Sequence, residues 1–512
     1  MPDRWPTRTR GAAPPVTTAV RLGEDTLVHH AARVAVPTYD RTALKRAVVH
    51  ISVGSFHRSH QAVYFDDLAE RDITSGWGVT GVGLRRPQMR EVLAAQDGLY
   101  TVVARDAAGD EARVIGAIGR YLFAPQDDGA VIDALSDSET RLVTLTITSA
   151  AYCVDAATGS FDARHPEVVA DLSAPAGPTS ALGHLVEALD RRRRAGAEPF
   201  TVLSCDNVPG NGHMTRSALV GFAALRDPRL AAWIDERVAF PDSMVDRITA
   251  KTTVADRTLV ERRFGVADRW PVITEPFSQW VVEDSFCNGR PPLDEVGVRF
   301  VGDVRPYALL KTRLLNASHC ALGHLGALAG HRRTDEGMDD FVFGAYVAHL
   351  MRDDVAPLLP HAPGVDVPGY QETLLERLGN PKIGDELTRL RRNGSSKIPT
   401  HVLSSIADAR RQRRAHPLLT MAVAGWCRQL CGLDDDGRRL PVDDPLVDAL
   451  QPLAVAGGND PRPLLGFRSV FGRLGDDAGF AAELEQALVA IDRHGARGAV
   501  AACLDGDRQV AA

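Results

Sequence analysis

An alternation of strand and helix patterns along residues 47–204 most constrains the fold of this chain. The apolar strand pattern Ala47–Val53 is followed by Gly54 and by a helical pattern at 62–71. Further strand patterns follow at 77–84, 99–105, 112–122, 141–152 and 200–204. Strands that alternate with helices in this way form a mostly parallel sheet, because each helix carries the chain back across one face. The sequence therefore predicts an α/β fold with a dinucleotide-binding topology in this part of the chain.

Helical patterns dominate the rest of the chain, at 308–330, 337–352, 370–378, 383–392, 417–432, 446–454 and 477–492. The change follows the loop Gly289-Arg-Pro-Pro292, whose composition is typical of a linker. We therefore expect a disordered tail at 1–24, a dinucleotide-binding α/β domain of Rossmann type at 25–295, and a mainly α-helical substrate and catalytic domain at 296–512.

Charge and composition exclude several classes of protein. The 512 residues carry a net charge of −7, which argues against nucleic acid as the main partner because phosphate binding favours a basic face. The one dense basic run, Arg191–Arg194, ends a helical pattern and is expected to be solvated. No apolar stretch of about 18 residues is present, so no membrane span is expected. The seven cysteines form no CxxC pair, which favours a reduced, cytoplasmic protein without a structural zinc site.

The glycine turn after the first strand is a candidate cofactor site. Its candidate residues are Val53, Gly54, Phe56, His57 and Arg58. A helix that starts directly after a strand offers free N–H groups to a pyrophosphate. The phosphate-binding fingerprint has several glycines, whereas this turn has one, and a lone glycine after a strand is more often an ordinary turn.

The same segment has a metal site as an alternative. His57 and His60, with Asp66 or Asp67, have side chains that bind metals. Nothing in the sequence supplies the rest of a coordination shell, so we expect no metal.

The end of the second strand pattern bears on the choice of cofactor. NAD enzymes usually place an acid there, which bonds the 2′-hydroxyl of the adenosine ribose. Here Arg85 and Arg86 follow Leu84, and the first acid is Glu91. Two guanidinium groups suit the 2′-phosphate of NADP, or they are solvated charges ahead of a helix. NAD and NADP are both candidate cofactors.

The segment 308–330 is apolar on nearly every side and yet contains Lys311, Asn316 and His319. On a regular α-helix, at about 100° per residue, these side chains share an arc of roughly 140°. A helix that is apolar all round is buried, and burial lowers the pKa of a lysine, so that its free amine can act as a general base. The alternative is a lysine that reaches the surface beside a hydrogen-bonded core histidine.

Other polar residues suit a substrate. Asn207 follows the strand pattern at 200–204, at the sheet edge where ligands of open α/β sheets bind. Further candidates for substrate binding are Asp246, Arg389, Arg392 and Lys397. The aspartate precedes an arginine in an apolar stretch, so the two form either a structural ion pair or part of a site. The three basic residues flank a Gly-Ser turn and suit a polyhydroxylated or carboxylated ligand, or they are solvated surface.

Taken in order, a set of motifs resembles the polyol-specific long-chain dehydrogenase/reductase family. The motifs are VGSFHRSHQ (53–61), TLTIT (144–148), SCDN with NG (204–212), FPDSMVDRIT (240–249), EPFSQWVVED (275–284), KTRLLNASH (311–319) and NGSSKIP (393–399). The resemblance spans roughly residues 25–505 and implies a Rossmann-type N-terminal domain, a helical C-terminal domain and no metal. It also implies a monomer or a small homo-oligomer.

The resemblance implies an activity and roles for particular residues. We expect an NAD(P)-dependent oxidoreductase that interconverts a mannitol- or arabinitol-like polyol and its ketose by hydride transfer. Lys311 corresponds to the general base. Asn207 and Asn316 correspond to the amides that hold the alcohol oxygen, and His319 to a substrate-orienting residue. Two members of the basic patch, the arginine at 389 and the lysine at 397, correspond to residues lining the substrate pocket.

Some positions differ from the family pattern. The family usually has Gly at the position of Ser52 and Pro at that of Ala250. It commonly has glutamates at the positions of Ser149 and Ala308, where they are associated with proton passage to solvent. These differences leave the substrate open. One alternative is a hexuronate (fructuronate-type) reductase whose basic patch grips a carboxylate, and another is a non-catalytic nucleotide-binding or sensor protein.

Overall fold

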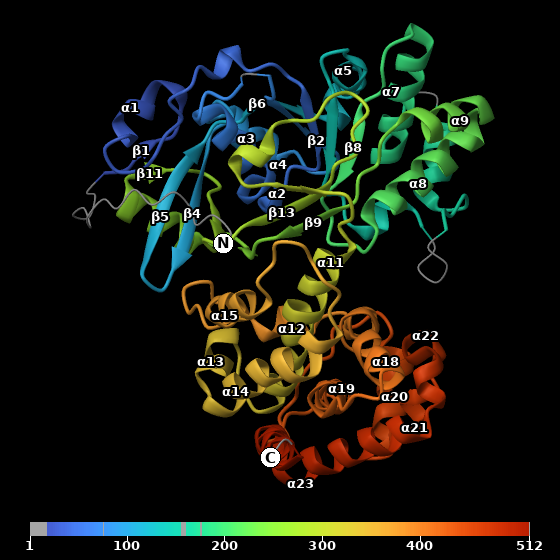
Figure 1. Cartoon of the computed structure of the whole chain (residues 1–512). Coiled ribbons are helices and arrows are strands. Elements are labelled where there is room, and N and C mark those ends of the chain that lie inside the picture. Colours follow the sequence, from blue (N-terminus) through green and yellow to red (C-terminus); the bar gives the residue numbers. More distant parts are fainter. Residues whose placement is uncertain (1–17, 75, 155–159, 175–176, 511–512) are drawn as a thin grey trace. The chain divides into compact units, whose positions relative to one another are not determined.

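The computed structural model of the chain describes residues 18–74, 76–154, 160–174 and 177–510 (Figure 1). The chain forms two compact units, Met1–Arg305 and Pro306–Ala512. Among the described residues, no helix combines the length and the apolar composition needed to span a membrane. None of the seven cysteines is joined to another by a disulfide.

The first unit is built on a five-stranded parallel sheet. Its strands, in spatial order, are β6 (Ile118–Phe123), β3 (Val79–Gly83), β2 (Val48–Ile51), β7 (Leu142–Leu145) and β8 (Thr201–Ser204). Numbered along the chain, this order is third, second, first, fourth and fifth, which is the order of a Rossmann fold. The central strands β2 and β7 are buried on both faces, as expected where helices cover a parallel sheet. The predicted Rossmann-type α/β class is therefore confirmed.

Helices connect these strands. After β2, β3 and β6 come α2 (Ser55–Ser59), α3 (Gln61–Glu70), α4 (Gln88–Ala94) and α5 (Ala124–Ser136). After β7 and β8 come α6 (Pro166–Ser173), α7 (Ala181–Ala195), α8 (Asn211–Arg226) and α9 (Pro228–Arg237). The sequence explains the bounds of α7: the Ser180 side chain accepts a hydrogen bond from the Gly183 N–H, and Gly196 ends the helix at a φ of 69°.

Smaller sheets complete the described part of this unit. One contains β4 (Tyr100–Asp106), β5 (Gly109–Ile115), β10 (Thr249–Ala250) and β12 (Val272–Thr274), and another contains β9 (Ser243–Asp246), β13 (Gln279–Glu283) and β14 (Arg299–Val301). Of the predicted tail at 1–24, residues 1–17 lie outside the described residues. The remainder contains β1 (Val20–Arg21), which pairs with β11 (Val266–Ala267). At the other end, β14 pairs with β13, so the strand sequence of this unit extends past the predicted boundary at 295.

Two predicted strands differ from the observed ones. The pattern at 112–122 divides at Gly116, because β5 pairs antiparallel with β4 whereas β6 enters the parallel sheet. The pattern at 141–152 ends as a strand at Leu145, although the β-branched residues Thr146, Ile147 and Thr148 follow and favour a strand. Thr148 has a φ of 71°, and the chain then forms the short helix η3 (Ser149–Tyr152), so the strand cannot continue.

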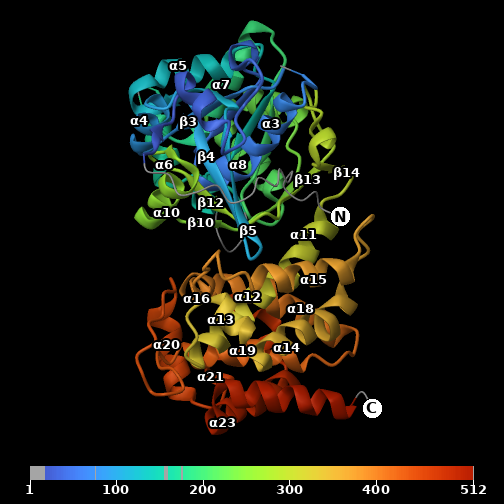
Figure 2. The same cartoon turned by 90° about the vertical axis from the view of Figure 1, so that its left-hand side faces the viewer.

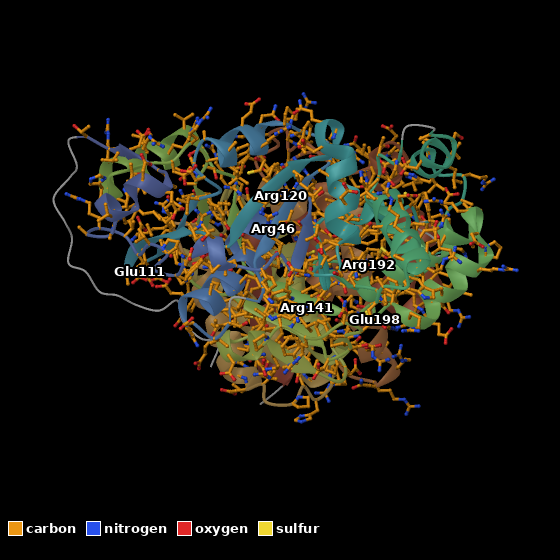
Figure 3. The ribbon with its side chains drawn as sticks, turned by 90° about the horizontal axis from the view of Figure 1, so that it is seen from above. Arg46, Glu111, Arg120, Arg141, Arg192 and Glu198 are labelled. Carbon is orange, nitrogen blue, oxygen red and sulfur yellow. The ribbon has the colours of Figure 1, made fainter. Side chains whose placement is uncertain are left out.

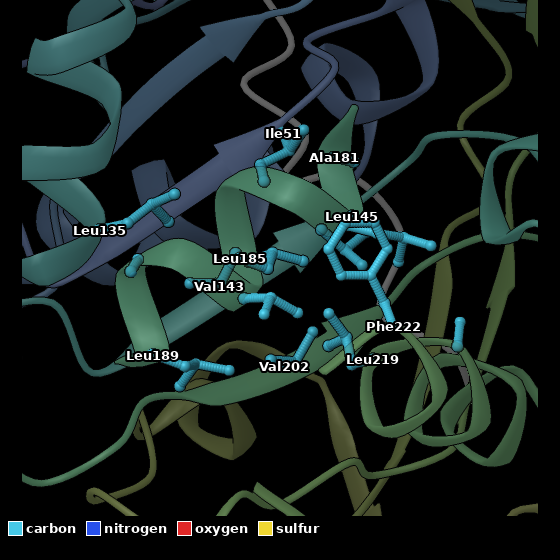
Figure 4. Close-up of a cluster of buried hydrophobic side chains, with 14 of the residues drawn as sticks. Ile51, Leu135, Val143, Leu145, Ala181, Leu185, Leu189, Val202, Leu219 and Phe222 are labelled. Carbon is cyan, nitrogen blue, oxygen red and sulfur yellow. The ribbon is translucent and has the colours of Figure 1, made fainter. Parts of the chain in front are cut away.

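A buried apolar cluster joins the central sheet to the helices that cover it (Figure 4). Side chains of α7 and α8 meet those of β7 and β8 there, among them Leu185, Leu219, Phe222, Val143 and Val202. Each of these is at most 1% exposed. Removal of such side chains from water is the main favourable term in folding, at about 25 cal/mol for each Å² of apolar surface.

Arg192 differs from the solvated run predicted at 191–194. Its side chain is 1% exposed, and Figure 3 labels it together with Glu198 in the first unit. The guanidinium donates hydrogen bonds to the carbonyl oxygens of Glu198 (2.6 Å), Thr140 (2.6 Å) and Leu135 (3.0 Å). Burial lowers the pKa of Arg192 to about 10, so the guanidinium is still charged near pH 7. The carbonyl groups stabilise this buried charge.

The second unit is helical. It contains α11 (Arg305–Lys311), α12 (Ala317–Ala321), α13 (Thr334–Asp339), α14 (Phe341–His349), α15 (Val367–Leu378), α16 (Leu387–Arg391), α17 (Gly394–Ile398), α18 (Ser404–Arg411), α19 (Pro417–Gln429), α20 (Val447–Gly457), α21 (Arg462–Leu465), α22 (Arg468–Phe471) and α23 (Ala478–Val510). The buried α19 packs against α23, which bends at Gly495 (Figure 2). Segments with π-helical geometry are η6 (Thr312–Asn316), η7 (Leu322–Gly326), η8 (Leu350–Val355) and η10 (Pro399–Leu403).

The cluster of Figure 4 leads to a prediction about stability. We expect Leu219→Ala to lower the free energy of unfolding by about 2–5 kcal/mol, because it leaves a cavity between α8 and the sheet. Leu225→Ala, on the same helix but 46% exposed, is the control and should cost less than about 0.5 kcal/mol. Urea unfolding measures both, and equal losses would contradict the assignment of the core.

Candidate active site

The carboxyl edge of the central sheet contains a topological switch point between β2 and β7. The chain leaves β2 to build β3 and β6 on one side, and then crosses to build β7 and β8 on the other. In open α/β sheets the crossovers diverge at such a point, and ligands bind outside the carboxyl ends of the strands there. The glycine turn, Thr148 and Asn207 all follow strands at this edge.

The turn after β2 is held by both neighbouring strands. The Ser52 N–H donates to the Val82 carbonyl (2.8 Å), and the Ser52 carbonyl accepts a bond from the Thr146 hydroxyl (2.9 Å). Ser52 has a φ of 72°, a conformation that glycine adopts at lower cost. The glycine that the resemblance implies at this position would adopt this conformation without the strain of a side chain.

Gly54, the N-cap of α2, has the space that a bound pyrophosphate requires. A Cβ atom built there would meet only the Ser52 carbonyl oxygen, at 3.9 Å. The N–H groups in the first turn of a helix have no acceptor within that helix. Open space and free N–H groups at the switch point fit the pyrophosphate of a dinucleotide. Beside the turn, Val53 is buried and Phe56 is half-buried.

His57 and Arg58 have fully buried side chains. The His57 ring stacks on the ring of His50, with 3.4 Å between ring centroids. Burial lowers the pKa of His50 to about 3 and that of His57 well below its usual value, so both imidazoles are neutral near pH 7. The Arg58 guanidinium donates to the Trp270 carbonyl (2.6 Å) and lies over the Tyr100 ring. The side chains of His57 and Arg58 therefore lie in the core beneath the turn and present no surface to a cofactor.

The side chains proposed as alternative metal ligands point to other partners. His60 Nε2 donates to the Gln279 carbonyl (2.9 Å), and its Nδ1 accepts a bond from Gln61. Asp66 and Asp67 both accept hydrogen bonds from the Arg113 guanidinium, each at 2.5 Å. Within the described ranges, no group of three histidine, cysteine or acidic side chains has the arrangement of a metal site.

Arg85 and Arg86 are exposed after the end of β3. Arg85 forms an ion pair with Glu167, from the first turn of α6. This carboxylate comes from a helix more than 80 residues farther along the chain, so the local sequence did not reveal it. A 2′-phosphate that binds Arg85 would therefore compete with Glu167.

Asn207 is exposed at the carboxyl end of β8, in a tight backbone turn. The Val208 N–H donates to the Asp206 carbonyl (2.8 Å), which closes a three-residue turn with Asn207 at its centre. The Asn211 side-chain amide donates to the same carbonyl (3.0 Å). The backbone that carries the Asn207 side chain is thus fixed by hydrogen bonds on both sides.

Asp246 and Arg247 stand at the end of β9, and both are buried. The Arg247 guanidinium donates to the Glu275 carbonyl through Nε (3.1 Å) and Nη2 (3.0 Å), and to the Ser59 carbonyl through Nη1 (2.6 Å). Burial lowers the pKa of Arg247 to about 10. Arg247 therefore joins three segments of the first unit through backbone carbonyl groups.

The helical segment that begins at α11 in the second unit contains a π turn directly after Lys311. Lys311 is 6% exposed, whereas Asn316 and His319 are half-buried. A π turn has i→i+5 hydrogen bonds and rotates less per residue than an α turn, so the common arc calculated for a regular α-helix does not apply across residues 312–316. Such turns are frequent at functional sites.

Arg313 anchors this π turn. Its guanidinium donates to Asp408 Oδ2 (2.5 Å) and to the Leu358 carbonyl (3.2 Å), and its side chain is 7% exposed. These two hydrogen bonds of Arg313 fix the position of the segment between Lys311 and Asn316.

Lys397 and His401 form a second polar group of this unit. Lys397 Nζ donates to the carbonyl oxygens of Leu390 (2.9 Å) and Arg389 (3.3 Å), in the last turn of α16. Burial, reinforced by the positive charges of Lys397 and Lys311, lowers the pKa of His401 to about 4. The η10 segment with His401 packs against η6. His401 is not among the predicted site residues, although its spacing of four residues from Lys397 was a usable signal.

The two arginines proposed to grip a carboxylate already have acidic partners. Arg389 donates through Nε to Asp385 Oδ1 (2.6 Å) and pairs through Nη2 with the other oxygen of the same group. Arg392 forms an ion pair with Asp443 (2.7 Å). A substrate carboxylate would have to displace these partners, which disfavours the hexuronate alternative.

The strand order and the open helix start at the switch point define a dinucleotide-binding protein of the Rossmann class. Residues 46–295 match the mannitol dehydrogenase Rossmann domain family, and residues 303–492 match the mannitol dehydrogenase C-terminal domain family. The chain therefore belongs to the mannitol dehydrogenase family. The predictions of this family and of a polyol dehydrogenase are confirmed.

Individual relatives cover nearly the whole chain. A mannitol 2-dehydrogenase of Aspergillus fumigatus is 45% identical over 474 residues, which is 91% of this chain and 94% of the relative. A mannitol 2-dehydrogenase of Pyricularia oryzae is 44% identical over 470 residues, or 90% of this chain and 94% of the relative. The Pseudomonas fluorescens mannitol 2-dehydrogenase, solved as a ternary complex with NAD and D-mannitol, is 39% identical with a TM-score of 0.86, covering 95% of this chain and 100% of that one. A D-sorbitol dehydrogenase solved without substrate is 34% identical, also with a TM-score of 0.86, covering 94% and 100%.

The stacked histidines lead to a prediction about acid stability. An unfolded chain protonates histidine near pH 6.5, whereas the buried His57 stays neutral at lower pH, so its contribution to stability falls as the pH drops below about 6.5. His57→Phe keeps a stacked ring without the titration. We expect this variant to lose about 2 kcal/mol less than the wild type between pH 7 and pH 5, measured by urea unfolding. His29→Phe, at an exposed histidine, is the control, and identical pH dependence in all three proteins would contradict the prediction.

Proposed function

We propose that the protein oxidises a mannitol- or arabinitol-like polyol to its ketose, and catalyses the reverse reduction, with NAD as a cofactor. The proposal is supported by the match to the family over both units and by the 39% identical relative solved with NAD and D-mannitol. The observation that carries it is the buried Lys311 at a π turn of an apolar helix. A panel of alditols, ketoses and keto-uronates, followed by NADH and NADPH absorbance, tests the substrate class. Turnover of keto-uronates alone would favour the reductase alternative.

In this proposal, Lys311 accepts the proton of the substrate hydroxyl as a free amine. The amides of Asn207 and Asn316 donate hydrogen bonds to the oxygen as it becomes an alkoxide, and His319 orients the substrate. Donors placed in advance stabilise the developing negative charge without reorganising, so no metal ion is required. The bound nicotinamide supplies the hydride acceptor.

Other residues have binding roles in this proposal. The N–H groups of α2 at Gly54 hold the pyrophosphate. Asp246, Arg389, Arg392 and Lys397 remain proposed substrate-binding residues. Because the two arginines and the lysine already have partners, we assign them to the shape and charge of the pocket rather than to direct capture of a carboxylate.

The proposed base leads to a prediction about turnover. We expect Lys311→Ala to lower kcat at least about 100-fold, since general-base catalysis contributes a factor of this order. Cofactor affinity, measured by NADH fluorescence, should change less than about threefold, because Lys311 acts only on the substrate proton. Added primary alkylamines should restore part of the activity. Lys45→Ala, at an exposed lysine, is the control, and a kcat for Lys311→Ala within threefold of wild type would overturn the assignment.

The arginines after β3 lead to a prediction about cofactor choice. We propose that NADP is accepted at least as well as NAD, because Arg85 and Arg86 suit a 2′-phosphate. Arg85→Asp should lower kcat/KM with NADP relative to NAD at least about tenfold, since it replaces attraction by repulsion. Glu167→Gln should shift the same ratio in the opposite direction, because it removes the carboxylate that competes for Arg85. A wild-type preference for NAD of 100-fold or more would exclude the proposal.

A further inference from the structure

Thr148 has a backbone conformation that needs an explanation. Its φ of 71° and ψ of 155° lie outside the regions favoured by β-branched residues. Conformations of this kind cost about 1–3 kcal/mol and persist only where the surroundings impose them, which is often at functional sites. Thr148 follows β7 at the switch point and precedes Ser149, so the strain lies at the edge of the sheet where ligands of this fold bind.

The carboxylate of Asp206 imposes this conformation. Its Oδ1 accepts a hydrogen bond from the Thr148 N–H (2.9 Å), and its Oδ2 accepts bonds from the Ile147 N–H (3.0 Å) and the Tyr152 hydroxyl (2.8 Å). The Tyr152 hydroxyl also bonds the Ser204 hydroxyl at the end of β8 (2.5 Å). The Asp206 side chain therefore accepts hydrogen bonds from two successive backbone N–H groups of the strained turn. The Tyr152 hydroxyl links the same carboxylate to Ser204 at the end of β8.

The same residue defines the turn that carries Asn207. Its carbonyl accepts hydrogen bonds from the Val208 N–H and from the Asn211 amide. The Asp206 carboxylate thus ties the end of β7 to the tight turn after β8. The carboxylate is bonded to the segment after β7, and the carbonyl is bonded within the turn after β8. A movement of either strand end therefore also moves the peptide that joins Asp206 to Asn207.

We infer that Asp206 is a positioning residue for the dehydrogenase reaction: it locks the strained turn at Thr148 to the turn of Asn207 and so fixes the direction of the Asn207 amide. The inference rests on the proposed function, in which Asn207 donates to the substrate oxygen. It adds a residue that acts through Asn207 and does not touch the substrate.

A double-mutant cycle tests the inference. In Asp206→Asn, an amide NH₂ group replaces one carboxylate oxygen and faces a backbone N–H donor, so the lock is lost. We expect kcat to fall at least about tenfold, while the Kd for NADH stays within about threefold of wild type. The double variant with Asn207→Ala should have a kcat within about threefold of Asn207→Ala alone, because residues that act through one another do not add.

Asp268→Asn is the control for loss of a carboxylate that accepts hydrogen bonds from backbone N–H groups. Asp268 also accepts two backbone N–H groups, those of Thr101 (2.5 Å) and Trp270 (2.8 Å), together with a side-chain amide. We expect this control to lower the unfolding midpoint and to keep kcat within about threefold of wild type. Thr148→Gly added to Asp206→Asn should recover at least about threefold in kcat, since glycine adopts the positive φ without the carboxylate.

The outcomes distinguish failure of the proposed role of Asn207 from failure of the inference about Asp206. If Asn207→Ala has wild-type kcat, the role of Asn207 in the proposed function fails, and the inference fails with it. If Asn207→Ala is impaired and Asp206→Asn has wild-type kcat, or if the two losses multiply in the double variant, only the inference is overturned. Should Asp206→Asn fail to fold, Asp206→Glu replaces it: the longer side chain displaces the carboxylate, a kcat at least about threefold lower supports the inference, and wild-type kcat overturns it.

Discussion

Hydrogen bonding where parallel strands end is the constraint on which the first unit depends. A strand that stops leaves N–H and C=O groups that its neighbours no longer satisfy, and burying them without partners is costly. Here side chains from the adjacent strand ends form hydrogen bonds with these groups: the Thr146 hydroxyl donates to the Ser52 carbonyl, and the Asp206 carboxylate accepts from the Thr148 N–H. Ser52 and Thr148 both have a positive φ. The turn at the proposed pyrophosphate site and the turn of Asn207 are therefore shaped by partners on a neighbouring strand.

This dependence explains which parts of the fold could be predicted from the sequence. The alternation of strands and helices is encoded locally, and it led to the Rossmann-type class. The end of β7 is not encoded locally, because β-branched residues continue after Leu145 and the end of the strand depends on Asp206, about 60 residues farther along the chain. Arg192 has the same character: its burial depends on carbonyl groups of other segments rather than on its place in a basic run.

The candidate site shows the same division. Lys311, Asn316 and His319 were recognised because they interrupt an apolar helix and match the motif of a known family. The π turn between Lys311 and Asn316 was not recognised, because it accompanies a contact between Arg313 and Asp408, which lie far apart in the sequence. The pairing of Arg85 with Glu167 was equally invisible, since exposed charges carry no sign of their partner in the sequence. Residue types at the site were thus predictable, whereas their directions and competing partners were not.

The π turn also limits how the second unit can change in evolution. A π turn holds one more residue than an α turn between hydrogen-bonded groups. Loss of one residue within 312–316 would restore α geometry with little rotation between the flanking helices, because the five residues of the π turn span nearly the same angle as four residues of an α-helix. The side chains within the turn, among them Arg313, would instead change direction relative to the flanking helices. A family member that lacks one residue between Lys311 and Asn316 should therefore keep the phase of the two helices but lose the contact of Arg313 with Asp408.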